Sequence, residues 1–126
     1  MSPLKAGSEA AFQQQVVNLA QLYAWRCYHT HDSRRSQAGF PDLVLVRGAE
    51  LIFAELKTQS GRVRTEQTEW IQALTDVAAG VSRLWDQGAG HATPDTSVEV
   101  FLWRPDDFDR LHARLARGRH LLERAS

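Results

Sequence analysis

The feature that most constrains the fold is a pair of short apolar runs near the middle of the chain. Residues 43–46 and 51–56 are joined by Arg47-Gly48-Ala49-Glu50, a spacing that is typical of a β-hairpin. The second run carries apolar residues at adjacent positions, and therefore on both faces of a strand. This pattern predicts an interior strand with other elements packed around it.

Three charged residues border or interrupt this apolar hairpin. Asp42 precedes the first run, and Glu55 and Lys57 stand on either side of Leu56 in the second. Since strand side chains alternate between faces, Glu55 and Lys57 point to one side while Leu56 points into the core. Considered alone, Asp42 can be explained as a turn residue that opens a strand. Glu55 and Lys57 can likewise be explained as a surface ion pair on an edge strand. On an interior strand, however, such charges need partners or a metal.

The flanking sequence predicts helices and further strands around the hairpin. Ser8 and Thr65 can each cap a helix, and Pro105 ends a strand. In chain order the other expected elements are a helix at 9–23, a strand at 27–30, a helix from 65, a strand at 98–103 and a last helix to about 117. Their buried stripes are Phe12, Val16, Leu19, Ala20 and Tyr23; Trp70, Ile71, Leu74 and Val77; and Phe108, Leu111 and Leu115.

This order predicts an α/β fold with a central mixed sheet of about four strands flanked by helices. Residues 1–126 are expected to form a single domain, with 1–7 as a loose lead-in. Residues 80–97 contain Gly80, two further glycines and Pro94, which predict an excursion loop with room for a short helical turn at 81–85.

Composition narrows the class of protein. The chain is 43% hydrophobic and 24% charged, ordinary values for a globular protein, and no apolar run reaches the ~20 residues of a membrane span. The polar start predicts no signal peptide. A single cysteine, Cys27, excludes an internal disulfide and a thiolate metal cluster. A cytoplasmic protein that does not act at a membrane is the simplest expectation.

The formal net charge is zero, which weighs against a nucleic-acid binder, because phosphate affinity comes from many Lys and Arg contacts. The distribution matters more than the sum. From Arg26 to Arg64 the sequence contains seven basic residues and four acidic ones. If two of those acids, Asp42 and Glu55, hold a cation, the middle of the chain becomes locally basic.

Two further polar residues lie on the apolar stripes of the predicted helices. Glu9 precedes Phe12 by three residues in the first helix, and Gln67 precedes Trp70 by three residues in the second. Both side chains are therefore expected to face the body of the protein. Glu9 and the charged residues of the hairpin, Asp42, Glu55 and Lys57, would then supply one another with partners.

These residues resemble a known signature. Pro41-Asp42 followed by Glu55-Leu56-Lys57 is similar to the motif of the PD-(D/E)XK nuclease superfamily. The surrounding Gly39-Phe40-Pro41-Asp42-Leu43 and the downstream Gly61, Gln67 and Trp70 resemble its VRR-NUC branch, and so does the opening Ser8-Glu9. The resemblance runs from about 8 to 74 and resumes at 98–105. It implies a restriction-endonuclease-like core; small stand-alone members occur in bacteria and phages, some as homodimers that cut DNA junctions or flaps.

The resemblance also implies a role for each motif residue. Asp42 and Glu55 would be the metal-binding carboxylates, with the Leu56 carbonyl as an extra ligand. Glu9 would bind metal directly or through water. Lys57 would orient or deprotonate the attacking water, and Gln67 would hold water or Lys57 in place. Oxygen ligands without His or Cys suit Mg²⁺ or Mn²⁺ rather than zinc.

Candidate DNA contacts lie in the loops on either side of the hairpin. Arg34, Arg35, Arg62 and Arg64 are expected to supply phosphate contacts, their alternative being solvated loop charges. His31, with His29, fits either a phosphate or water contact or simple surface exposure. The arginines of the last helix better fit a solvated face; they are Arg110, Arg114, Arg117 and Arg119. Trp25, Trp70, Trp85 and Trp103 are expected in the core or an interface.

The leading hypothesis is a metal-dependent DNA endonuclease, selective for branched, junction or flap DNA, that leaves 5′-phosphate and 3′-hydroxyl ends. One alternative is a non-catalytic DNA-binding module with the same fold, which would bind DNA without cutting it. Another is a sequence-specific restriction-type enzyme, although the short loops offer few residues to read base edges in a groove.

Overall fold

The computed structural model describes residues 8–30, 37–86 and 96–118. The elements in chain order are α1 (Glu9–Leu22), β1 (Arg26–His29), β2 (Leu43–Arg47), β3 (Glu50–Leu56), α2 (Thr65–Asp86), β4 (Ser97–Trp103), the 3-10 helix η1 (Pro105–Asp107) and α3 (Phe108–Ala116). Within these ranges, no helix has the length and apolar character needed to cross a membrane.

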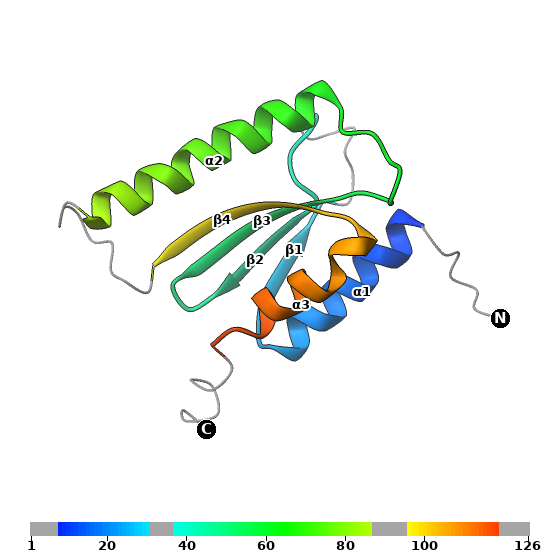
Figure 1. The fold of residues 1–126 in the computed structure, drawn as a ribbon, viewed down its shortest axis with the longest axis horizontal. Coiled ribbons are helices and arrows are strands. Elements are labelled where there is room, and N and C mark those ends of the chain that lie inside the picture. Colours follow the sequence, from blue (N-terminus) through cyan, green and yellow to red (C-terminus); the bar gives the residue numbers. More distant parts are fainter. Residues whose placement is uncertain (1–7, 31–36, 87–95, 119–126) are drawn as a thin grey trace.

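The four strands form one mixed sheet in the order β1-β2-β3-β4. The first three are antiparallel neighbours, whereas β3 and β4 run parallel. A parallel pair needs a crossover connection, and α2 lies within the connection between them. Figure 1 shows α2 on one face of the sheet and α1 with α3 on the other. The predicted α/β fold with a four-stranded mixed sheet is confirmed.

The β2–β3 hairpin forms where the apolar runs predict it. Gly48 adopts a φ of +60°, which glycine reaches without steric cost, and the turn pairs Arg47 with Glu50. The pair Leu45 and Ile52 is fully buried. β3 has a strand on each side, as expected for an interior strand.

The core fills the space between the sheet and the α1–α3 layer. Its largest members are apolar side chains with almost no exposed surface. They are Phe12, Val16, Trp25, Leu43, Leu45, Ile52, Leu56, Trp103, Leu111 and Leu115. Ser8 caps α1 as predicted, because its hydroxyl oxygen accepts from the Ala11 N–H at 3.3 Å.

The prediction of a loop at residues 80–97 is wrong for its first part, because helix α2 extends into it. It runs through Gly80 to Asp86, so residues 80–86 of the predicted 80–97 loop are helical, and 87–95 lie outside the described residues. A single glycine costs a helix only about 1 kcal/mol relative to alanine, too little to end this one. Within the predicted buried stripe, Val77 is 56% exposed, and Trp70, Ile71 and Leu74 are half-buried.

Two arginines are buried at the turn end of the hairpin, and for one of them, Arg114, the prediction of a solvated helix face is wrong. Arg114 lies in α3 and bonds the carboxylates of Glu50 and Glu99. Arg47, counted above among the basic charges of the middle region, donates to Glu50 and to backbone carbonyls and covers the Trp25 ring at 4.4 Å. Buried guanidinium groups need such partners, and sequence periodicity alone does not reveal them.

The loop that leads into β2 is locked against the start of α2. Gly39 has a φ of +90°, and a Cβ placed there would lie 2.5 Å from the carbonyl oxygen and 2.7 Å from the Cβ of Glu66. Only glycine fits this approach of two backbones. The loop from Gly39 to Asp42 is thereby fixed relative to α2.

We expect Gly39→Ala to lower the free energy of unfolding by about 3 kcal/mol, because strain at positive φ adds to a clash with fixed backbone. Gly48→Ala is the matched control, since its φ is +60° but nothing lies within 4 Å of the added Cβ. That control should lose only about 1 kcal/mol. Urea denaturation of both variants measures the difference, and equal losses would contradict the close approach.

Candidate active site

A hydrogen bond between a side chain and the backbone brings the two predicted carboxylates together. Asp42 directly precedes β2, and its Oδ2 accepts the backbone N–H of Leu56 at 2.8 Å. Leu56 is the last residue of β3, so this bond fixes the Asp42 carboxylate beside Glu55. The preceding Pro41 is fully buried, which anchors the chain at this point.

Glu55 is the most buried charged residue among those described, with 1% of its surface exposed. Its Oε2 accepts from the Gln67 amide at 2.8 Å and lies 3.8 Å from the Lys57 Nζ. Its Oε1 is buried and has no hydrogen-bond partner within the described part of the chain. A buried carboxylate oxygen left unpaired is costly, and it marks where a further group could bind.

The environment of Glu55 disfavours its charged form. Burial and the neighbouring Asp42 carboxylate raise the pKa of Glu55 from 4.5 to about 8, although Lys57 acts in the opposite direction. Glu9 adds a smaller upward contribution to this pKa. Without a bound cation, the site therefore favours a proton on Glu55 at neutral pH.

Lys57 and Gln67 approach Glu55 from two different elements. Lys57 follows β3 and is 8% exposed, with its backbone N–H donating to the Trp103 carbonyl at 3.0 Å. Gln67 lies in the first turn of α2 and is also buried. Its Oε1 accepts the Arg64 N–H at 2.9 Å, so the amide bridges the start of the helix and Glu55.

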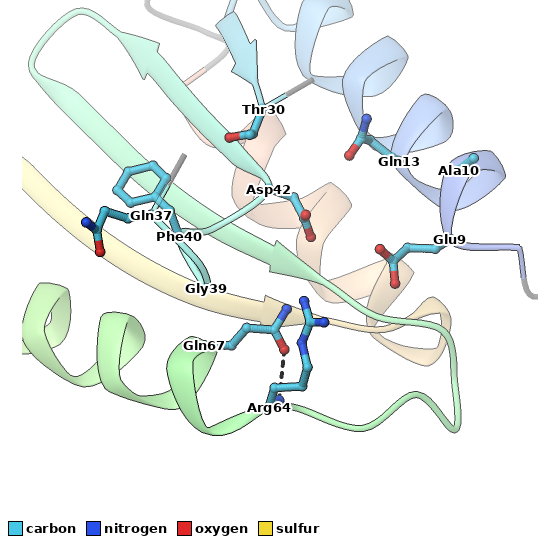
Figure 2. Close-up of a pocket in the computed structure, with 10 residues that line it drawn as sticks. All are labelled: Glu9, Ala10, Gln13, Thr30, Gln37, Gly39, Phe40, Asp42, Arg64 and Gln67. Atoms are coloured by element: carbon cyan, nitrogen blue, oxygen red, sulfur yellow. Dashed lines mark hydrogen bonds between the residues drawn. The ribbon is translucent and has the colours of Figure 1, made fainter. Parts of the chain in front are cut away.

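Glu9 is predicted to face the body of the protein, and only part of this prediction is correct. Its side chain is exposed rather than inward, because it stands in the first turn of α1 at the end of the sheet. Figure 2 shows the Glu9 carboxylate directed toward Asp42 across a pocket. The pocket, about 450 Å³ in volume, is lined by Glu9, Ala10, Gln13, Thr30, Gln37, Gly39, Phe40, Asp42, Arg64 and Gln67.

The donor set fits a hard divalent cation through two carboxylates rather than three. Within 8–30, 37–86 and 96–118, no three His, Cys, Asp or Glu residues are grouped closely enough to hold a metal ion. Asp42 and Glu55 nevertheless adjoin, and the free Glu55 Oε1 is an oxygen donor. Mg²⁺ commonly uses one or two carboxylates and completes its shell with water and phosphate. The role of the Leu56 carbonyl stays a prediction.

The structure describes two of the five predicted DNA-contact residues. Arg64 lines the pocket beside Gln67, and Arg62 is exposed in the same connection between β3 and α2. The other three, His31, Arg34 and Arg35, lie outside the described residues.

Sequence reasoning did not single out Gln13 and Thr30, both of which line the pocket. Gln13 stands one helical turn after Glu9, so its place on the same side of α1 follows from the i, i+4 spacing. Thr30 directly follows β1 and is paired with the hairpin, since its N–H donates to the Asp42 carbonyl at 3.4 Å. Such a pairing across the sheet has no local sequence signal.

Comparison with known proteins supplies one match. The family model described as the VRR-NUC domain matches residues 4–82, a span that contains Glu9, Asp42, Glu55, Lys57 and Gln67. No curated protein and no solved structure matches the chain. The family has the restriction-endonuclease-like fold, in agreement with the mixed sheet and its flanking helices. By the extent of this match, more than half of its length, the chain belongs to the VRR-NUC domain family.

Proposed function

We propose that this nuclease-type domain is a metal-dependent DNA endonuclease. The observation that carries the proposal is the unpaired, buried Glu55 Oε1 beside the Asp42 carboxylate, with Lys57 adjoining. In its charged form this oxygen meets no hydrogen-bond donor among the described residues, and the Asp42 carboxylate beside it repels a second negative charge. A cation at this position would satisfy that oxygen and offset the repulsion between the two carboxylates.

Asp42 and Glu55 would hold the cation, and Mg²⁺ or Mn²⁺ suits their oxygen atoms. The Leu56 carbonyl is a candidate further ligand. Glu9 is exposed and its carboxylate points toward Asp42 across the pocket, which supports a role in which it binds the ion through water. When bound, the ion supplies positive charge that lowers the pKa of a water molecule and stabilises the phosphoryl oxygens.

Two side chains of the protein, Lys57 and Gln67, have the remaining roles in the reaction. Lys57 orients the attacking water and balances negative charge that builds on the phosphate. Gln67 fixes the Glu55 Oε2 through its amide, so that Glu55 keeps one orientation. Water attacks the phosphodiester in line and leaves a 5′-phosphate and a 3′-hydroxyl.

Branched, junction or flap DNA is the proposed substrate class. Arg64 at the pocket and the exposed Arg62 can contact phosphates without reading a base sequence. A homodimer would set two such sites against two strands of a junction, and we include this assembly in the proposal.

The central test incubates the purified protein with linear, flapped and four-way branched DNA, with and without Mg²⁺ or Mn²⁺. We expect cleavage only with the ion, and faster on branched DNA. Lys57→Met and Asp42→Asn should each slow cleavage by roughly 100-fold or more. The matched controls Lys5→Met and Asp109→Asn, which change a lysine and an exposed aspartate elsewhere, should cut like the unaltered protein.

Three results would each overturn a part of this proposal. Cleavage that survives both site substitutions would exclude this pocket as the active site. Ion-independent DNA binding without any cutting would instead indicate a binding module. A fixed cleavage motif on random duplex would replace structure selectivity with sequence recognition.

The raised pKa of Glu55 predicts a pH-dependent stability. Because the pKa of Glu55 is about 8 in the folded protein and ordinarily 4.5, unfolding releases a proton between these pH values, and the free energy of unfolding falls as pH rises through this window. We expect metal-free Glu55→Gln to be more stable than the unaltered protein at pH 8 by on the order of a few kcal/mol, and similar at pH 5. Urea titrations at both pH values measure this.

Cation binding gives the same prediction a second readout. Mg²⁺ should stabilise the unaltered protein more at pH 8 than at pH 5, because the ion and the proton compete for Glu55. Glu69→Gln, which removes an exposed carboxylate of α2, is the control and should retain the full effect. Equal stabilisation of Glu55→Gln by Mg²⁺ would show that Glu55 is not a ligand.

A further inference from the structure

A turn at residues 58–61 is held by a guanidinium group from the end of β4. Arg104 directly follows that strand, and its Nη1 donates to the Thr58 carbonyl at 2.7 Å and the Gly61 carbonyl at 2.8 Å. The carbonyl of Gln59 lies 3.4 Å from the same nitrogen. One charged donor therefore contacts the carbonyl oxygens of three of the four turn residues, and a charged donor forms a stronger hydrogen bond than a neutral one.

Further bonds fix Arg104 and the turn to η1. The Arg104 N–H donates to the Asp107 Oδ2 at 2.9 Å, and the Asp106 N–H donates to the Gln59 Oε1 at 3.0 Å. The turn itself closes through the Gly61 N–H, which donates to the Thr58 carbonyl at 3.2 Å. The turn is thus tied to the segment that follows β4.

The same turn packs against the side chain of Lys57. A Cβ added at Gly61 would lie 3.6 Å from the Lys57 Cδ and 2.8 Å from the Thr58 Oγ1, so the turn backbone runs alongside the lysine stem. The Lys57 N–H is bonded to Trp103, the neighbour of Arg104. Both constraints on the lysine therefore come from the end of β4.

We propose that Arg104 is a positioning residue for Lys57. By fixing the turn, it holds the lysine stem so that Nζ stays within 3.8 Å of the Glu55 Oε2. This inference rests on the proposed nuclease function, but Arg104 lies beyond the residues 4–82 that the family model matches. Since a displacement of about 1 Å in a catalytic group can reduce the rate by 100-fold, a distant clamp of this kind matters for the chemistry.

The test compares Arg104→Met with the control Arg83→Met, which removes an exposed arginine of α2. We expect Arg104→Met to lower kcat by roughly 10- to 100-fold, with the KM for DNA and the Mg²⁺ midpoint within about twofold of the unaltered protein. The control should match the unaltered protein in all three.

A second readout follows Lys57 without requiring cleavage. The chain has two lysines, Lys5 and Lys57, so an amine-specific reagent with mass spectrometry can compare their labelling rates in folded, metal-free protein. Release of the turn should expose Lys57 and raise its labelling relative to Lys5 by about threefold or more. Arg104→Lys keeps the charge with a smaller donor group and should shift kcat and labelling together, by less than Arg104→Met.

Unchanged kcat and unchanged Lys57 labelling in Arg104→Met would overturn the inference. So would a kcat loss that disappears after correction for the folded fraction, measured by urea denaturation. If Arg104→Met does not fold, Arg104→Lys decides by the same two readouts. A protein that cuts no DNA refutes the proposed function, whereas the labelling result still shows whether Arg104 holds Lys57.

Discussion

The hydrogen bond from the Leu56 backbone to the Asp42 carboxylate determines the geometry of the candidate site. It closes the open end of the β2–β3 hairpin with a side chain, where continued strand pairing would have used backbone groups. The consequence is a carboxylate fixed next to Glu55 in a buried setting, which raises the pKa of Glu55. The architecture therefore maintains two adjoining acids whose repulsion is relieved by a proton on Glu55 or, in the function proposed above, by a bound cation.

The two ends of the same hairpin differ in the charges that meet there. At the turn end, the guanidinium groups of Arg47 and Arg114 contact the carboxylates of Glu50 and Glu99, with Trp25 stacked beside them, although the Arg114 Nη1 is buried without a hydrogen-bond partner among the described residues. At the open end, Glu55 lies beside a second acid, Asp42, and its Oε1 is likewise unpaired. Paired charges at the turn end hold the strands and α3 in place, so the open end can retain an unsatisfied group that would otherwise destabilise the fold.

Local patterns predicted the parts of this structure that local physics controls. The hairpin, the interior β3 strand, the shared side of Glu55 and Lys57 and the inward direction of Gln67 followed from strand alternation and helical spacing. The errors arose where distant groups decide. The burial of Arg114 depends on acids from two other strands, and the exposure of Glu9 depends on how far α1 extends beyond the sheet. The continuation of α2 past Gly80 shows that one weak helix former does not outweigh a long helix.

Topology explains why the site gathers groups from so many segments. Because β1 and β4 both run parallel to β3, their carboxyl ends meet at one edge of the sheet, which places Thr30, Lys57 and Arg104 there. The crossover that makes β3 and β4 parallel must leave from this edge, and so α2 begins beside Glu55 with Gln67 in its first turn. Ligand sites in α/β folds form at such edges. The segment after β4 therefore belongs to the site as well. Since β4 pairs in parallel with β3, its last residue, Trp103, lies next to Lys57.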